Sequence, residues 1–282
     1  MTGEDNPWAP TETAQQVTRP VAGASWPGAP WPGAPGPATV AMQAGRPVRV
    51  PRWGLPSAIA AVLAAIALPG VVTLPALIGP GGVPVQAPPS GLVPLSTSLL
   101  LLALLAQWLP MAGIPLLVSV LRGNGPRLDF GLSIARRDLA PGILGGLVAV
   151  GLALIVALLT FLVYGEFQSS AEQLLGLLER GPYLIIAIIV GVVIAAPLVE
   201  EICFRGLLWG ALAKRGLSPW WATVISAAAF AALHLEPVRF ILLFGTGLVL
   251  GYLRQRTGRL GPPIIAHAVN NGIAALGLIA AV

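Results

Sequence analysis

The sequence predicts an all-α protein, a polytopic transmembrane helix bundle of about seven spans with a disordered N-terminal tail. Of its 282 residues, 56% are hydrophobic and 10% are charged, whereas soluble domains carry about 25% charged residues. The mean hydropathy is +0.83. The apolar residues fall into seven separate runs, most of them near the ~20 residues that a helix needs to cross a bilayer.

Residues 1–50 form the expected tail. This segment is rich in Pro, Gly and Ala and repeats WPGAP at 26–30 and 31–35. It lacks the apolar side chains needed to offset the entropy lost on ordering, so we expect it to be disordered. Its first 20 residues contain no apolar core, so we do not expect a signal peptide.

The rest of the chain, 51–282, is the expected transmembrane domain. Two of its runs exceed the ~25 residues of an ordinary span and are expected to tilt, protrude or break. Pro110 and Pro115 favour a kink in the second run. The apolar runs are 55–79, 92–121, 141–164, 183–213, 219–235, 239–253 and 262–282.

The basic residues predict the orientation of the bundle. Most of them precede the first run or follow the second, fourth and sixth runs, which with seven spans places these residues on one face. The opposite loops hold only Arg180 and Arg239, beside four glutamates. By the positive-inside rule this face is cytoplasmic. We therefore expect a multi-pass protein of the cell (plasma) membrane with a cytoplasmic N-terminus. The bilayer explains the basic excess, so no nucleic acid is expected as a partner.

Charged side chains inside the fourth run are the first candidates for a functional site. Charges at membrane depth cost about 2.5–3.5 kcal/mol each, so they usually face a protein interior or a water-filled cavity. Glu201 and Arg205 are four residues apart and can pair on one helix face. Glu200 is turned about 100° away from Glu201. We expect Arg205 to neutralise Glu201 and to leave Glu200 available as a base.

The only two histidines of the chain lie in later apolar runs. Phe230 precedes His234 by four residues, and Asn271 follows His267 by four residues, so each pair shares one helix face. A carboxylate and a neutral imidazole can hold and deprotonate a water, while a second imidazole and an amide can donate hydrogen bonds to an oxyanion. This combination suits amide hydrolysis.

Other interpretations of these residues stay open. Glu200, His234 and His267 could bind zinc, because carboxylate and imidazole are ordinary zinc ligands, although the chain contains no H-E-x-x-H motif. Intramembrane Glu and His could also relay protons in a small transporter. In a non-catalytic membrane scaffold, the same groups would serve only as contacts between helices.

Together the three motifs resemble the CPBP family of intramembrane proteases, the CAAX prenyl protease and bacteriocin-processing family, also called Abi. The family motifs are E-E-x-x-x-R, F-x-x-x-H and H-x-x-x-N, and they occur here in this order on apolar segments. The resemblance covers roughly 140–282, a protease-like core. The matching residues are Glu200, Glu201 and Arg205, then Phe230 and His234, then His267 and Asn271.

The resemblance implies a CAAX-protease-like intramembrane endopeptidase, of glutamic or metallo type. It implies that Glu200 is the catalytic glutamate, which activates a water together with His234. It also implies that His267 and Asn271 stabilise the oxyanion. The expected partners are prenylated, peptide or other membrane-associated protein substrates, whose peptide bonds would be cleaved.

The same resemblance implies a supporting role for Glu201, Arg205 and Phe230 around the site. No cofactor is favoured, because Asn271 suits an oxyanion donor better than a zinc ligand. Zinc, held by Glu200, His234 and His267, is the alternative.

Overall fold

The computed structural model is a bundle of helices that describes residues 37–78, 97–165, 186 and 188–280. Within these ranges, seven helical segments occur in the order of the seven predicted runs, so the all-α fold is confirmed. Four of them, α3, α4, α6 and the segment that ends with α12, are long and apolar enough to cross a membrane. The segments are α3 (Leu55–Leu77), α4 (Thr97–Arg122), α6 (Arg136–Tyr164), the compound helix 188–214, α11 (Pro219–Leu233), α12 (Phe240–Thr257) and α13 (Gly261–Ala280).

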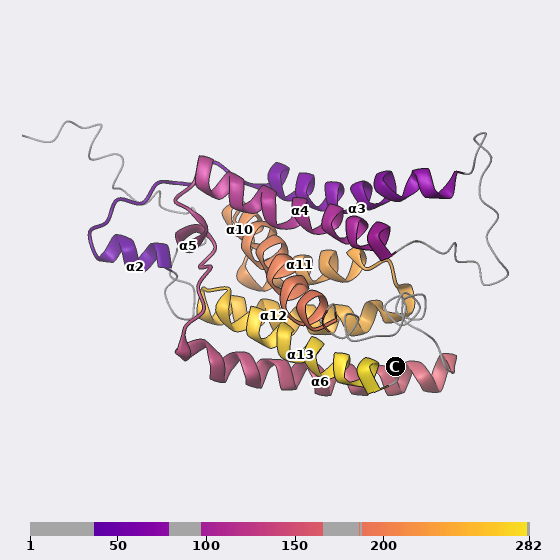
Figure 1. Cartoon of the computed structure of the whole chain (residues 1–282). Coiled ribbons are helices and arrows are strands. Elements are labelled where there is room, and N and C mark those ends of the chain that lie inside the picture. The colour runs from indigo at the N-terminus through magenta and orange to yellow at the C-terminus, as the bar shows by residue number, and fades with distance from the viewer. Residues whose placement is uncertain (1–36, 79–96, 166–185, 187, 281–282) are drawn as a thin grey trace, which may run out of the picture.

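The helices form three layers (Figure 1). Helices α3 and α4 pack together on one side of the bundle, and α6 and α13 pack together on the opposite side. The compound helix, α11 and α12 lie between these pairs. The central position of the compound helix matters because it carries both candidate glutamates.

The beginning of the described chain differs from the prediction. Residues 1–36 of the expected tail lie outside the described residues, but α2 (Pro37–Gln43) is helical. Ala38 and Ala41 are buried there, because α2 packs against the short helix α5 (Pro126–Asp129). The described end of this segment thus contains a short helix, whose small apolar side chains pack against α5.

Polar contacts connect the segment before α3 with α4, α5 and the last residue of the compound helix. Buried Asp129 accepts hydrogen bonds from Trp53 Nε1 at 2.9 Å and from Ser119 Oγ at 2.8 Å. Lys214 Nζ donates to the carbonyls of Pro51 and Trp53. Lys214 is the last residue of the compound helix, so these contacts anchor the end of that helix.

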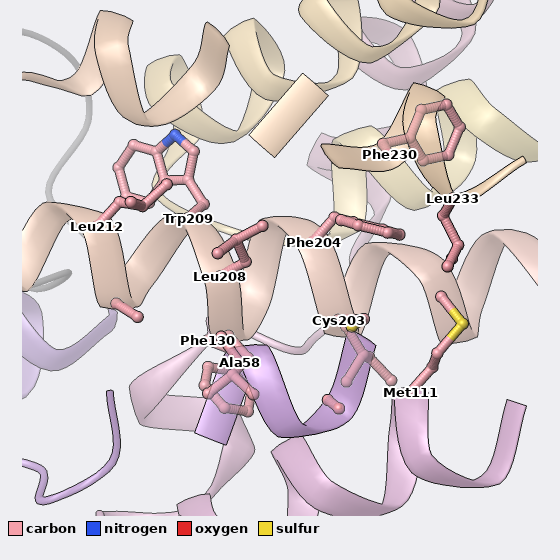
Figure 2. Packing of buried hydrophobic residues seen from close by; sticks show 14 of the residues in the cluster. Ala58, Met111, Phe130, Cys203, Phe204, Leu208, Trp209, Leu212, Phe230 and Leu233 are labelled. Carbon is pink, nitrogen blue, oxygen red and sulfur yellow. The ribbon is translucent and has the colours of Figure 1, made fainter. Parts of the chain in front are cut away.

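The hydrophobic core gathers around the second half of the compound helix, where residues 201–213 are all buried. In Figure 2, Met111 of α4 and Ala58 of α3 lie on the face of the compound helix that carries Cys203, while Phe204 extends towards Phe230 of α11. The rings of Phe204 and Phe230 meet edge to face, with centroids 5.6 Å apart. The second half of the compound helix, 201–213, is thus enclosed by neighbouring helices.

The sixth helix is longer than the predicted run 239–253. A 3₁₀ turn, η4 (Pro237–Arg239), leads into α12, which continues to Thr257. Arg254, which we predicted to follow the span in a cytoplasmic loop, therefore lies within the helix and is only 1% exposed. It is buried because its guanidinium finds a backbone acceptor in the compound helix.

Close packing of α6 against α13 depends on glycine. A Cβ at Gly146 would lie 2.6 Å from Val269 Cβ and 2.8 Å from the carbonyl oxygen of Ala266. Small residues let helix backbones approach closely in membranes, where packing drives association. This contact fixes the position of α13, which carries His267.

We predict that Gly146→Ala lowers the free energy of unfolding by about 1–3 kcal/mol, because the added methyl group has no space. Gly151 on the same helix is a matched control, because a Cβ there would meet nothing within 4 Å. Gly151→Ala should be neutral or stabilising by up to about 1 kcal/mol. Thermal unfolding of the purified protein in detergent measures both effects, and equal losses in the two variants would contradict the close packing.

Candidate functional site

The compound helix changes its hydrogen-bonding pattern along its length. Its segments are η2 (Ile188–Ala195), α9 (Ala196–Glu201), η3 (Ile202–Leu208) and α10 (Trp209–Lys214), of which η2 and η3 are π-helical. Such i→i+5 segments are rare in proteins, and those that occur are often found at functional sites. Over the described residues 188–213, the long run does not break but stays helical, with two wider π-helical segments.

Pro197 explains one gap in this pattern. Proline has no backbone N–H. Residue 197 therefore cannot donate the hydrogen bond that an i→i+5 pattern would direct to the carbonyl of Val192. Asn271 of α13 fills the gap, because its Nδ2 donates to the Val192 carbonyl at 2.9 Å. Side chains of neighbouring helices commonly satisfy such freed carbonyls in membrane proteins. One N–H of Asn271 is therefore used on the helix, and only the second could meet an oxyanion.

The expected pair of Glu201 and Arg205 forms, with 2.8 Å between Oε1 and Nη1, and both side chains are 0% exposed. Arg205 Nη2 also donates to the carbonyl of Gly247 in α12 at 3.0 Å. Its guanidinium lies 4.7 Å from the ring centroid of Phe230. Arg205 thus connects the compound helix with α11 and α12.

His267 lies beside both glutamates. Its Nδ1 is 3.0 Å from Glu201 Oε1, and its Nε2 is 3.7 Å from Glu200 Oε2. The carboxylate of Glu201 is an acceptor, so Nδ1 carries a proton and donates it. The side chain of Glu200 is 15% exposed and that of Glu201 is 0% exposed. Glu200 is therefore the acid that can be reached from outside the core.

His234 is held by its own helix. Its Nδ1 lies 2.8 Å from the carbonyl oxygen of Phe230, which can only accept, so Nδ1 is the donor and the neutral ring keeps its lone pair on Nε2. The Phe230 ring contacts both imidazoles, with centroids 4.9 Å from His234 and 5.6 Å from His267. Phe230 therefore links the two histidines by ring packing.

The structure brings most of the expected residues together, with one difference. The imidazole beside Glu200 is that of His267, and none of the contacts in the described part of the chain joins Glu200 directly to His234. The reason is that Glu201 accepts a hydrogen bond from Nδ1 of His267, which directs Nε2 of the same ring towards Glu200. The expected residues in mutual contact are Glu200, Glu201, Arg205, Phe230, His234 and His267, with Asn271 one turn beyond His267.

The alternative zinc ligands do not gather around one point. In the described ranges, no group of three or more His, Cys, Asp or Glu side chains is arranged to hold a metal ion. The Nδ1 atoms of His234 and His267 both donate to protein acceptors, an arrangement that metal-ligating histidines also show. A mechanism without metal therefore stays a prediction.

An apolar cavity of about 390 Å³ lies between the compound helix and α13. It is lined by η2 and α9 on one side and by α13 on the other. Leu198, two residues before Glu200, and Ala268, directly after His267, are among its lining residues. The cavity therefore lies along the two helices that carry the acids and His267, and its lining residues are apolar.

We predict that Glu201→Ala destabilises the protein by about 3–5 kcal/mol, because it leaves Arg205 buried without its carboxylate. Glu236→Ala is the matched control, since the pair of Glu236 and Arg239 has the same kind of contact at 2.9 Å but is partly exposed. Its loss should cost about 0–1 kcal/mol. Thermal unfolding and the yield of monodisperse protein report the difference, and a stable Glu201→Ala variant would contradict the structural role of the pair.

Comparisons with known proteins agree with the motifs. Residues 182–273 match the family model of type II CAAX prenyl endopeptidase Rce1-like proteins. YdiL of Bacillus subtilis (strain 168), which is named as a membrane peptidase, is 30% identical over 151 residues, covering 52% of this chain and 57% of YdiL. The membrane-embedded CAAX protease MroQ of Staphylococcus aureus (strain USA300) is 28% identical over 166 residues, covering 56% of this chain and 65% of MroQ.

The matches cover less than two thirds of the length of either relative. No solved structure matches the chain. The family model includes every motif position from Glu200 to Asn271. The resemblance to the CAAX protease family that the three motifs predict is therefore confirmed, and in this membrane protein it is carried by the segment 182–273 that matches the Rce1-like model.

Proposed function

We propose that the protein is an intramembrane endopeptidase. The observation that carries this proposal is the difference between two adjacent acids. Glu201 is held by Arg205 and by His267 Nδ1, whereas Glu200 is partly exposed and has His267 Nε2 at 3.7 Å. One acid is thereby used to build the site, and the other is left to accept a proton. The likeness to membrane peptidases supports the same class of function.

In the proposed mechanism, a water beside Glu200 attacks the carbonyl carbon of a peptide bond and gives its proton to that carboxylate. The lone pair on His234 Nε2 orients the water. The oxyanion that forms accepts hydrogen bonds from His267 Nε2 and from the second N–H of Asn271. Glu200 then passes the proton to the amide nitrogen as the C–N bond breaks. This role requires protons on both ring nitrogens of His267.

The apolar cavity beside the site suggests how a substrate would bind. We propose that it receives the apolar part of a membrane-associated peptide, because its lining residues Leu198 and Ala268 lie on the two helices that carry Glu200 and His267. The name of the relative MroQ, a CAAX protease, makes prenylated peptides one substrate class to test. The distribution of basic residues supports a plasma-membrane location with the N-terminus in the cytoplasm.

We predict that Glu200→Gln abolishes cleavage, with a loss of about 100-fold or more, because the amide cannot accept the proton of the water. The melting temperature should stay near that of the wild type, since Glu200 does not pair with Arg205. Cleavage of a library of quenched fluorescent peptides by purified protein measures the loss, and Glu236→Gln serves as the control with full activity.

Retained cleavage by Glu200→Gln would contradict the proposed role of this residue. A wild-type protein that cleaves no peptide, and whose cellular phenotype survives Glu200→Gln, would support the scaffold interpretation instead.

We also predict that cleavage survives chelation. The metal content of the active, purified protein should be well below one ion per chain, and incubation with EDTA or 1,10-phenanthroline should leave the rate unchanged. Loss of activity with a chelator, followed by recovery on addition of zinc, would contradict the mechanism without metal.

A further inference from the structure

The compound helix has a second gap in its hydrogen bonding, just after its glutamates. The N–H of Trp209 donates to the carbonyl of Phe204, five residues back. The α-helical pattern that resumes in α10 would pair the N–H of Gly210 with the carbonyl of Gly206, four residues back. The carbonyl of Arg205 lies between these two acceptors, and this pattern assigns it no backbone N–H donor. A buried carbonyl left without a donor is costly, so a neighbouring group is needed.

Arg254 of α12 supplies the missing donor. Its Nε donates to the carbonyl of Arg205 at 3.1 Å, and its guanidinium lies 5.3 Å from the ring centroid of Trp209. In the described ranges no carboxylate forms an ion pair with Arg254, and its Nη1 has no hydrogen-bond partner there. Neutralising an acid therefore does not explain why this arginine is buried, whereas the bond to the carbonyl does.

The two gaps lie on either side of the glutamates. The carbonyl of Val192, before them, is held by Asn271 of α13. The carbonyl of Arg205, after them, is held by Arg254 of α12. A shift of the helix by one residue would turn each acid by about 100°. Two bonds to two different helices oppose that shift.

We propose that Arg254 is a positioning residue for the peptidase reaction. Through the Arg205 carbonyl it fixes the π-helical turn 202–208, and with it the direction in which Glu201 meets His267. Arg254 touches no reacting atom. An arginine suits the task better than a lysine, because Nε–H is part of a rigid planar group whereas the ammonium is a mobile point charge. The inference rests on the proposed function only for its kinetic readout.

A first experiment needs no activity. The chain has two histidines, so selective ¹⁵N-histidine labelling of the full chain in detergent gives NMR signals from His234 and His267 alone, and His234→Asn assigns them. Arg254→Lys and Arg254→Gln should both shift the ring nitrogen signals of His267. The signals of His234 should stay in place, because its Nδ1 is bonded within α11.

The exposed neighbour Arg256 provides the control, since Arg256→Gln removes a charge from the same turn and should move neither histidine. Unchanged His267 signals in Arg254→Lys, in protein with wild-type helix content, would overturn the proposal. Arg254→Lys keeps the charge and decides the question even where Arg254→Gln yields no folded protein.

A second experiment separates positioning from mere stabilisation. In peptide cleavage, Arg254→Lys should lower kcat by about 10- to 100-fold, because small displacements of catalytic groups are costly, and should change KM by less than about threefold. Wild-type kcat and KM with only a lower melting temperature would mean a purely structural role and would overturn the proposal. A wild-type protein that cleaves no peptide would refute the proposed function alone, and the NMR result would still decide the role of Arg254.

Discussion

The hydrogen-bonded unit of Glu201, Arg205 and His267 is the constraint on which the rest of the bundle depends. It joins the compound helix to α13 through His267 and to α12 through the carbonyl of Gly247. Charged groups cannot be left unpaired in an apolar interior without a large cost. These three helices can therefore pack only in the arrangement that completes the unit. The same contacts set the orientation of the His267 ring, so the stability of the fold and the geometry of the candidate site have one origin.

Close backbone approach makes this unit attainable. A Cβ at Gly247 would lie 2.9 Å from Ala227 Cβ, so glycine allows α12 to approach α11 and brings its carbonyl within reach of Arg205. At Gly146 the same effect brings α6 close to α13. Membrane helices associate through packing and interhelical hydrogen bonds, not through the hydrophobic effect. Small residues therefore allow the close approach of helices that the buried polar groups need to form their hydrogen bonds.

Local features of the site could be predicted from the sequence, whereas contacts between distant helices could not. The helix positions followed from apolar runs, and the pair of Glu201 and Arg205 followed from a spacing of four residues. That His267 lies beside Glu200 depends on how α13 crosses the compound helix, which spacing along the chain does not specify. Arg254 was placed in a loop because a charge after an apolar run usually marks the interface. Its burial depends on a carbonyl 49 residues earlier in the chain.

Pro197 is a sequence signal that could have revealed part of this arrangement. A proline inside a membrane helix frees a carbonyl, and the donor must come from another helix when water is excluded. Few polar side chains occur in the apolar runs, so Asn271 was one of a small number of available donors. Its bond to Val192 also bears on the proposed chemistry. An amide whose first N–H is fixed by the backbone holds its second N–H in a defined direction, and a preorganised donor is what stabilisation of an oxyanion requires.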